Sequence, residues 1–270
     1  MQRSRGAARV QLGSGARLEL LEQSGAAKAF LPRIHGPAPE VVFLNTSGGL
    51  TGGDEISFGV DIAGDVQATA TTQTAERAYA AAGGLARMRV SLSAGPGAAL
   101  DWLPQETILY DTAGLDRSTR IDLASDARLV WAEMLVLGRA AMGETLAQVD
   151  LRDRREIWRA GRLAMAEPVR LDSSALATAD GAMRAALTGG LRAFATVVLV
   201  ARGAEDALGP VRAALPMAGP AGGLEAAASA WDGRCVVRIA AADALPMKHA
   251  VAAVLAVLRG GRPLPRVWQI

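Results

Sequence analysis

The sequence predicts a mainly β protein, a large coiled or superhelical β-architecture of many short strands with a few α-helices in the C-terminal third. Apolar and polar residues alternate with period two in run after run, and Gly, Pro, Asp and Ser stand between the runs. No helical period intervenes before about residue 171, which argues against an alternating βαβ order. The chain has 270 residues, 50% of them hydrophobic, so we expect one domain with a full core over residues 1–270.

The β-rich part is expected over about residues 8–171. Alternation is clear in EISFGVDI and ARMRVSL, and RLVWAEMLVL is an apolar run that only Glu133 interrupts. Strands are predicted at residues 16–22, 40–44, 55–62, 65–72, 86–92, 106–110, 118–123, 128–137, 147–153 and 155–160. Three tryptophans, Trp102, Trp131 and Trp158, are spaced by 29 and 27 residues, which hints at a coiled repeat.

The mixed α/β part is expected over about residues 172–260, followed by a tail at 261–270. Helical spacing predicts a helix over 174–187, closed by Gly189 and Gly190, and a shorter one over 205–215. Residues 194–201 form an apolar strand pattern, and Asp232-Gly233 predicts a hairpin between 226–231 and 234–240. Asp243 can cap a helix over 243–259 that stops at Gly260.

Composition excludes several classes of function. The formal net charge is +2 and no basic block occurs, so we expect no nucleic-acid partner. One cysteine and two distant histidines exclude a disulfide and argue against a tight zinc site. No serine lies in a G-x-S-x-G motif. Neither a signal peptide nor a membrane-spanning run is present, so we expect a cytoplasmic chain with no membrane partner.

The densest local pattern is LNTSGGLTGGD at residues 44–54. Its glycine pairs imply tight turns with positive φ. A phosphate loop would need a lysine that is missing, and Asp54 would hinder an anion. Two interpretations remain: a cavity-facing turn that presents the Asp54 carboxylate, or a structural turn that Asp54 caps. The turn glycines are Gly48, Gly49, Gly52 and Gly53.

Further motifs make the chain similar to a known family. Five motifs follow one another along the chain: LNTSGGLTGGD (44–54), TTQTAERAY (71–79), WLPQETILY (102–110), LGRAAMGE (137–144) and PRVWQ (265–269). Their order and spacing resemble those of the urease accessory protein family UreD, called UreH in some bacteria. The resemblance runs from about residue 10 to the C-terminus. One departure is Glu76-Arg77-Ala78 before Tyr79, where the family often has a lysine.

The resemblance implies a largely β superhelical scaffold that is not an enzyme. Such a protein would bind apo-urease and accessory protein F, and the GTPase accessory protein G would join through F. The family resemblance also implies that Ni²⁺ passes through a water-filled internal tunnel to the urease active site. No cofactor would be tightly bound, and Ni²⁺ would be transient cargo.

Carboxylates suit a transient nickel path, because oxygen ligands hold Ni²⁺ more loosely than thiolate or imidazole. The candidate path residues lie in or beside the family-like motifs, with Glu167 a weaker member: Asp54, Glu106, Glu133, Glu144 and Glu167. Glu133 is either buried beside polar partners or turned outward by alternation, and an unpaired buried charge would be costly. A structural link between Arg139 and Glu144 is an equal alternative for that motif.

The predicted helix over 243–259 carries more apolar residues than one core-facing stripe requires. With the tail it is the candidate docking surface for accessory protein F, and the residues proposed are Leu255, Leu258, Val267 and Trp268. Cys235 is expected to pack as a small hydrophobe, and His249 to face solvent or an interface. His35 is a poor metal ligand on its own.

Two other functions stay open from the sequence. One is a purely structural interaction module with no metal path, which composition cannot separate from a nickel conduit. The other is a carbohydrate-active enzyme with two acids on facing strands, such as Glu106 with Asp111 or Asp54 with Glu144. The second is weakened by the low aromatic content of 4%.

Overall fold

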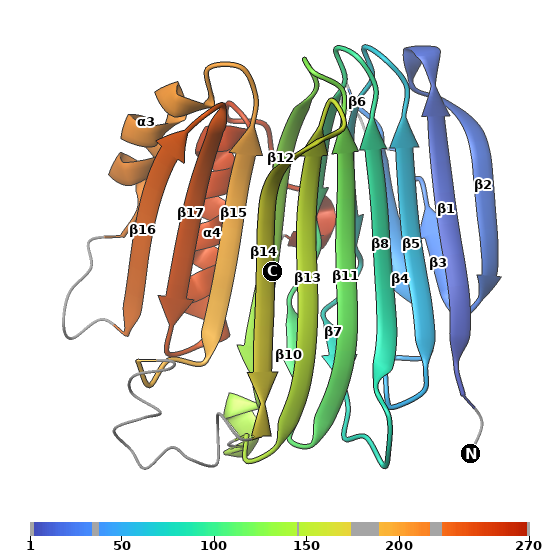
Figure 1. The fold of residues 1–270 in the computed structure, drawn as a ribbon, viewed down its shortest axis with the longest axis vertical. Helices are drawn as coiled ribbons and strands as arrows, with labels where there is room; N and C mark the ends of the chain where they lie inside the picture. The colour runs from blue at the N-terminus through green and yellow to red at the C-terminus, as the bar shows by residue number, and fades with distance from the viewer. Residues whose placement is uncertain (1–2, 34–37, 145, 174–188, 217–222, 269–270) are drawn as a thin grey trace.

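The computed structural model describes residues 3–33, 38–144, 146–173, 189–216 and 223–268. Within these ranges the chain forms two facing β-sheets (Figure 1), as the alternation predicts. The seven-stranded sheet has the order β14 (Arg162–Asp172), β13 (Val149–Arg159), β11 (Ala113–Leu123), β8 (Ala86–Ala94), β5 (Glu55–Ile62), β1 (Arg5–Gly13) and β2 (Arg17–Gly25).

The second sheet has ten strands among the described residues. Its order is β16 (Leu224–Trp231), β17 (Arg234–Ala241), β15 (Ala193–Val200), β12 (Arg128–Leu137), β9 (Ala99–Leu103), β6 (Gln67–Thr72), β4 (Glu40–Asn45) and β3 (Ala27–Phe30), with β7 (Glu76–Ala78) and β10 (Thr107–Leu109) branching from β12. The central strands pair in parallel within each sheet, and antiparallel hairpins close both ends.

The chain alternates between the sheets, from β5 to β6 to β8 to β9 to β11 to β12 to β13. Each coil therefore stacks on the previous one in parallel register, which is the solenoid-like arrangement expected from the sequence. Trp102 and Trp131 are direct register partners on β9 and β12. Their spacing of 29 residues is thus one coil. Trp158 lies in the other sheet, opposite Asp122, and does not continue that series.

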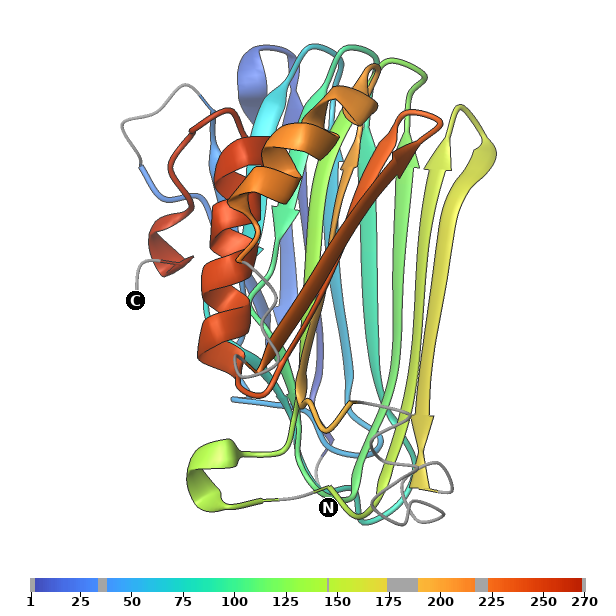
Figure 2. The ribbon, with the colours of Figure 1, turned by 90° about the vertical axis from the view of Figure 1, so that its left-hand side faces the viewer.

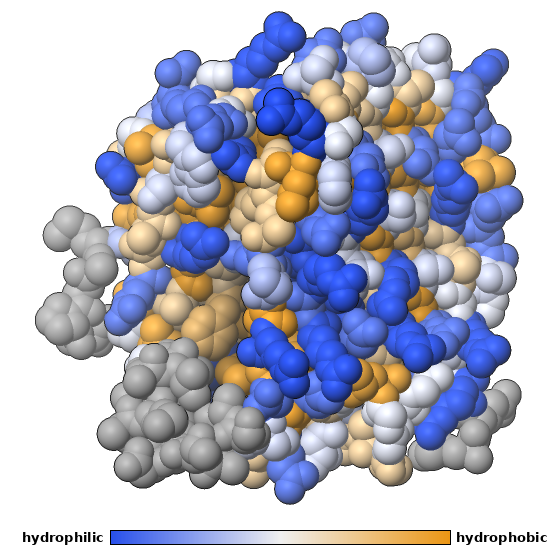
Figure 3. All heavy atoms as spheres, in the orientation of Figure 1, coloured by the Kyte–Doolittle hydropathy of each residue, from blue (hydrophilic) through white to orange (hydrophobic). Residues whose placement is uncertain are grey.

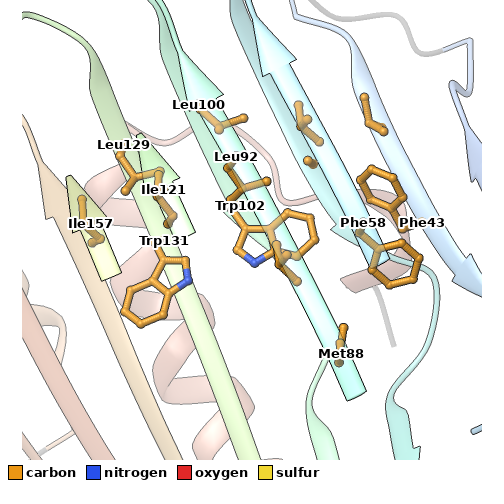
Figure 4. Close-up of a cluster of buried hydrophobic side chains, with 14 of the residues drawn as sticks. Phe43, Phe58, Met88, Leu92, Leu100, Trp102, Ile121, Leu129, Trp131 and Ile157 are labelled. Atoms are coloured by element: carbon orange, nitrogen blue, oxygen red, sulfur yellow. The ribbon is translucent and has the colours of Figure 1, made fainter. Parts of the chain in front are cut away.

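The main core lies between the sheets (Figure 4). Phe43 packs on Phe58 with ring centroids 4.9 Å apart and on Trp102 at 6.0 Å. Trp102 and Trp131 are almost completely buried. These large rings offset the low aromatic content, because one Phe or Trp buries roughly 150–250 Å².

Helices cover the outer face of the ten-stranded sheet (Figure 2), namely α3 (Leu208–Ala214) and α4 (Ala244–Leu258). Asp243 caps α4 by accepting the backbone N–H of Ala244, and Gly260 ends the helix with φ 62°. Both features confirm the predicted boundaries. Single 3₁₀ turns are η1 (Ser14–Ala16), η2 (Ala140–Met142), η3 (Ala204–Ala207) and η4 (Arg266–Trp268). No helix of the described residues is long and apolar enough to cross a membrane.

Several expectations need correction. Residues 147–153 and 155–160 belong to one strand, β13, and β1, β3, β7, β9 and β14 were not predicted. β14 escapes the pattern because it is an edge strand that contains Pro168, which interior strands avoid. The helix expected over 205–215 begins only at Leu208, after η3. The hairpin at Asp232-Gly233 is confirmed, with φ 46° and 71°. The helix expected over 174–187 lies outside the described residues.

Candidate functional site

The four family-like motifs meet at one end of the coils. The Tyr79 hydroxyl donates to the Gly48 carbonyl at 3.0 Å, and the Tyr79 ring meets the Tyr110 ring edge-on at 5.0 Å. Arg139 lies over the other side of this cluster, 4.4 Å from the Tyr110 centroid. Segments that are far apart in sequence are therefore in contact here, because parallel coils align their turns.

Asp54 caps the glycine-rich turn. Its carboxylate accepts the backbone N–H of Ser4 at 2.8 Å and of Thr51 at 2.9 Å, and the residue is 5% exposed. The structure therefore shows the capping role that the sequence left open. A Cβ on Gly52 would lie 2.3 Å from the Gly83 carbonyl oxygen, so this turn needs glycine. Gly48, Gly49 and Gly53 have positive φ.

Glu144 belongs to the same end. Arg139 donates two side-chain hydrogen bonds to it, both of 3.0 Å, and its backbone N–H donates a third. The Arg139 guanidinium, with backbone N–H donors, lowers the pKa of Glu144 to about 2. The structural Arg139–Glu144 link is therefore confirmed.

Glu106 connects the coils to α4. Its carboxylate lies 3.1 Å from the Lys248 ammonium, and the same ammonium donates to Gln105 at 3.0 Å. Both charged side chains are largely buried. Glu106 therefore helps to hold the helix on the sheet, whereas the Asp111 carboxylate accepts the backbone N–H groups of Ala147 and Gln148.

Glu133 begins a buried ionic network between the two sheets. It points inward, and Arg117 lies 2.8 Å from its carboxylate. Arg117 also contacts Asp153 at 2.5 Å and donates to Thr107 at 2.9 Å. None of the three charged side chains is more than 3% exposed. Burial opposes charge on Asp153, but Arg117 and Arg155 outweigh it and lower the pKa of that carboxyl.

The network continues to Glu167 on the edge strand β14. Arg155 contacts Asp153 at 2.7 Å and Glu167 at 3.0 Å. Glu167 also accepts from Arg238 at 3.0 Å and from the Thr196 hydroxyl at 3.2 Å. Two of the five sequence candidates, Glu133 and Glu167, are therefore brought into one chain of alternating charges, and the other three lie elsewhere.

Three members of the network, Arg117, Asp153 and Arg155, were not predicted from the sequence. A signal existed in β13, where Leu151 and Ile157 occupy the buried positions of the same face as Asp153 and Arg155. Charged residues at inward positions of a strand indicate a polar interior, since a buried charge must be paired. In VDLRDRREI the outward charges hide that pattern.

The network opens into a groove of about 850 Å³ between β14 and the strands β15, β16 and β17. Arg155, Glu167 and Arg238 form its polar side, and Phe194 and Leu171 belong to its apolar side. The exposed face of the seven-stranded sheet is largely hydrophilic, whereas apolar atoms show beside it near β15 and β17 (Figure 3).

The predicted docking residues are mostly part of the core. Leu255 and Leu258 are at most 4% exposed, and Trp268 is 8% exposed with its indole N–H donating to the Leu103 carbonyl at 2.9 Å. Val267 is half-buried, and its carbonyl accepts from Gln105. The premise that these side chains exceed the needs of the core is thus corrected: they fasten α4 and the tail to the sheet.

Within the described residues, no group of three or more His, Cys, Asp or Glu side chains is arranged to hold a metal ion. Cys235 is buried, as expected for a small hydrophobe, and His249 is exposed on α4. His35 lies outside the described residues.

Comparison with known proteins places the chain among relatives. The family described as "UreD urease accessory protein" matches residues 4–269. A protein of Cereibacter sphaeroides (strain ATCC 17025) named urease accessory protein UreD is 56% identical over 272 residues, covering 100% of this chain and 96% of the relative. Proteins of the same name from Dinoroseobacter shibae and Paracoccus denitrificans are 51% and 48% identical, each covering 100% of this chain and 94% of the relative. The chain belongs to the UreD family of urease accessory proteins and is a urease maturation factor, not a catalytic enzyme.

Proposed function

We propose that this chain is the cytoplasmic scaffold of a nickel-delivery complex, which binds apo-urease and accessory protein F, with G joining through F, and conducts Ni²⁺ to urease through its interior. The observation that carries this proposal is the row of buried carboxylates Glu133, Asp153 and Glu167 between the sheets, which ends in an open groove. Oxygen ligands bind Ni²⁺ loosely enough to release it, as a conduit requires.

The shared ion pairs support a revised choice of path residues. We propose Glu133 and Glu167 from the sequence candidates and add Asp153, because bridging arginines connect these three carboxylates. Asp54, Glu106 and Glu144 are engaged in a turn, in the α4 contact and in the Arg139 link. We retain them as secondary candidates at the ends of the coils.

Accessory protein F is proposed to dock on the outward face of α4. Leu245 is 56% exposed there, while the opposite face of the helix is buried. Leu245→Asp should weaken complex formation with F, and Leu163→Asp, at a residue 50% exposed on β14, is the matched control. Equal co-purification of F by both variants would move the interface elsewhere.

The passage is tested by separating assembly from activation. Glu133→Gln and Glu167→Gln keep side-chain size and should assemble with F, G and apo-urease, yet activate urease more slowly in nickel and bicarbonate. Asp122→Asn, on the outer face beside Arg120, is the control. Wild-type activation by both glutamine variants would exclude this path.

A specific observation supports a second candidate, a scaffold with no metal path. Each acid of the network already has an arginine partner, so the charges are balanced without a metal. In this case Glu133→Gln should lower activation only as far as it lowers folding or assembly, which circular dichroism and the pull-down would reveal.

A further inference from the structure

The strand β2 has a free edge. It pairs with β1 along one side, and among the described residues no strand pairs with its other side (Figure 1). Eight of its nine residues, Arg17–Gly25, are exposed, and none of them is proline. The backbone N–H and C=O groups of a free edge form a template on which another strand can pair. β2 is therefore a surface at which this sheet can gain a strand.

The other three terminal strands of the two sheets are protected. β14 contains Pro168, and the Arg234 guanidinium donates to the Ala164 carbonyl on that strand. At β16 the Arg212 guanidinium of α3 donates to the Ala228 carbonyl at 2.9 Å. β3 has only four residues. Proline, cover by a helix and short length are means by which proteins block an edge. β2 has only charged side chains, which repel or attract according to what lies opposite them.

β2 also turns apolar side chains toward the core. Leu18 and Leu21 are the register partners of Leu12 and Val10 on β1, both of which are completely buried. The two leucines share one face because a bulge at Glu19 shifts the alternation. The ten-stranded sheet ends on this side with the short β3, and Leu18 and Leu21 remain 44% and 40% exposed. A single chain thus leaves this pair of leucines partly uncovered.

Two copies of β2 are complementary in one antiparallel register. When Leu18 of one copy lies opposite Leu21 of the other, the two-fold axis passes through the bulge and the reciprocal pair is equivalent. In the same register Arg17 lies opposite Glu22. Both charged residues are exposed, and the Arg17 side chain, 80% exposed, lies 3.7 Å from Glu19 within the chain. Since neighbours in a strand alternate faces, leucines meet on the inner face and opposite charges meet on the outer face, and both kinds of pair stabilise an antiparallel contact.

We propose that two copies of this chain associate edge to edge through β2, in the antiparallel register that places Leu18 opposite Leu21 of the second copy. The two seven-stranded sheets then form one continuous sheet across a two-fold axis. The helices α3 and α4 lie at the opposite end of the sheets (Figure 1), so this contact leaves the face of α4 free. The inference does not depend on the nickel passage.

The test measures the mass of the purified full chain by size-exclusion chromatography with light scattering. The wild-type mass should rise toward that of two chains as the concentration is raised through the micromolar range. Arg17→Glu places like charges opposite each other at two equivalent positions and should raise the Kd of the dimer about tenfold or more. Adding Glu22→Arg should restore the wild-type Kd. Arg120→Glu, at an exposed arginine of the same sheet, should leave the Kd unchanged.

Cross-linking tests the register. The double variant Leu18→Cys with Leu21→Cys should form a covalent dimer on oxidation with diamide, whereas Leu18→Cys alone should not, because the two copies of residue 18 are not opposite each other. The native Cys235 is buried, so it does not compete. A wild-type chain that stays monomeric at every concentration would overturn the proposal. A dimer that is unaffected by Arg17→Glu, or a weakened dimer that Glu22→Arg does not restore, would also overturn it.

Discussion

The burial of Glu76 determines how the stability of the chain changes with pH. It lies on β7, where the Asn45 amide donates to its two oxygens at 3.2 and 3.3 Å. Burial raises its pKa from the ordinary 4.5 to about 7, against the opposing effect of Asn45. The folded chain therefore keeps a proton up to about pH 7 that the unfolded chain loses near pH 4.5, so stability falls as pH rises through this window.

Glu76→Gln removes this loss, because glutamine does not titrate. The interval from 4.5 to about 7 corresponds to at most about 3.5 kcal/mol, at about 1.4 kcal/mol per pH unit. Since the side chain is only half-buried by surface area, we expect a gain of about 1–2 kcal/mol in the free energy of unfolding.

Urea unfolding from pH 4.5 to 8, followed by circular dichroism, measures this gain. It should be near zero at pH 4.5 and grow until about pH 7, while Glu22→Gln at an exposed position should show no such trend. A Glu76→Gln chain that is less stable than wild type at pH 8, or equally shifted at every pH, would contradict a raised pKa of Glu76 in the folded chain.

Three further predictions concern other parts of the chain. Glu144→Gln should lower the free energy of unfolding by about 1–2 kcal/mol at pH 7, because Arg139 lowers the pKa of this carboxyl to about 2. This loss should shrink as the pH falls from 4.5 toward 2, and a pH-independent loss in urea unfolding would contradict the prediction. Asp101→Asn should lower the free energy of unfolding by about 3 kcal/mol and expose the segment after α4 to proteolysis, because buried Asp101 contacts Arg259 at 2.9 Å and Arg262 at 2.8 Å. Unchanged digestion would show that these ion pairs do not hold the segment in place. Cys235→Ala should leave urease activation nearly unchanged, because the buried thiol packs as a hydrophobe, and a loss of nickel transfer by the folded variant would show a thiolate ligand.

The coiled β-fold follows from local pattern, because alternation and turn residues mark most central strands. The order of the strands within each sheet cannot be predicted from local pattern, because parallel pairing joins residues one coil apart and leaves only a weak repeat in the sequence. Trp102 and Trp131 reveal that repeat because both face the core. β14 is hidden by its edge position and Pro168.

Only part of the candidate site could be predicted from local sequence patterns. Glu133 attracts notice because it interrupts an apolar run. Its partner Arg117 lies in the opposite sheet, and no local pattern relates positions across a sandwich. The terminal leucines Leu255 and Leu258 look surplus in sequence because the second core, between α4 and the sheet, is visible only in three dimensions.

The most direct measurement of conduction through the interior is the nickel content of urease. Apo-urease is assembled with F, G and this chain carrying Glu133→Gln, and bound Ni²⁺ is counted after activation, with Glu19→Gln at an exposed strand position as control. Glutamine keeps the size of the buried side chain and removes the carboxylate charge that would attract the cation. We expect normal assembly with much less nickel in urease for Glu133→Gln, and wild-type nickel for Glu19→Gln. Wild-type nickel content in a normally assembled Glu133→Gln complex would contradict conduction through the interior.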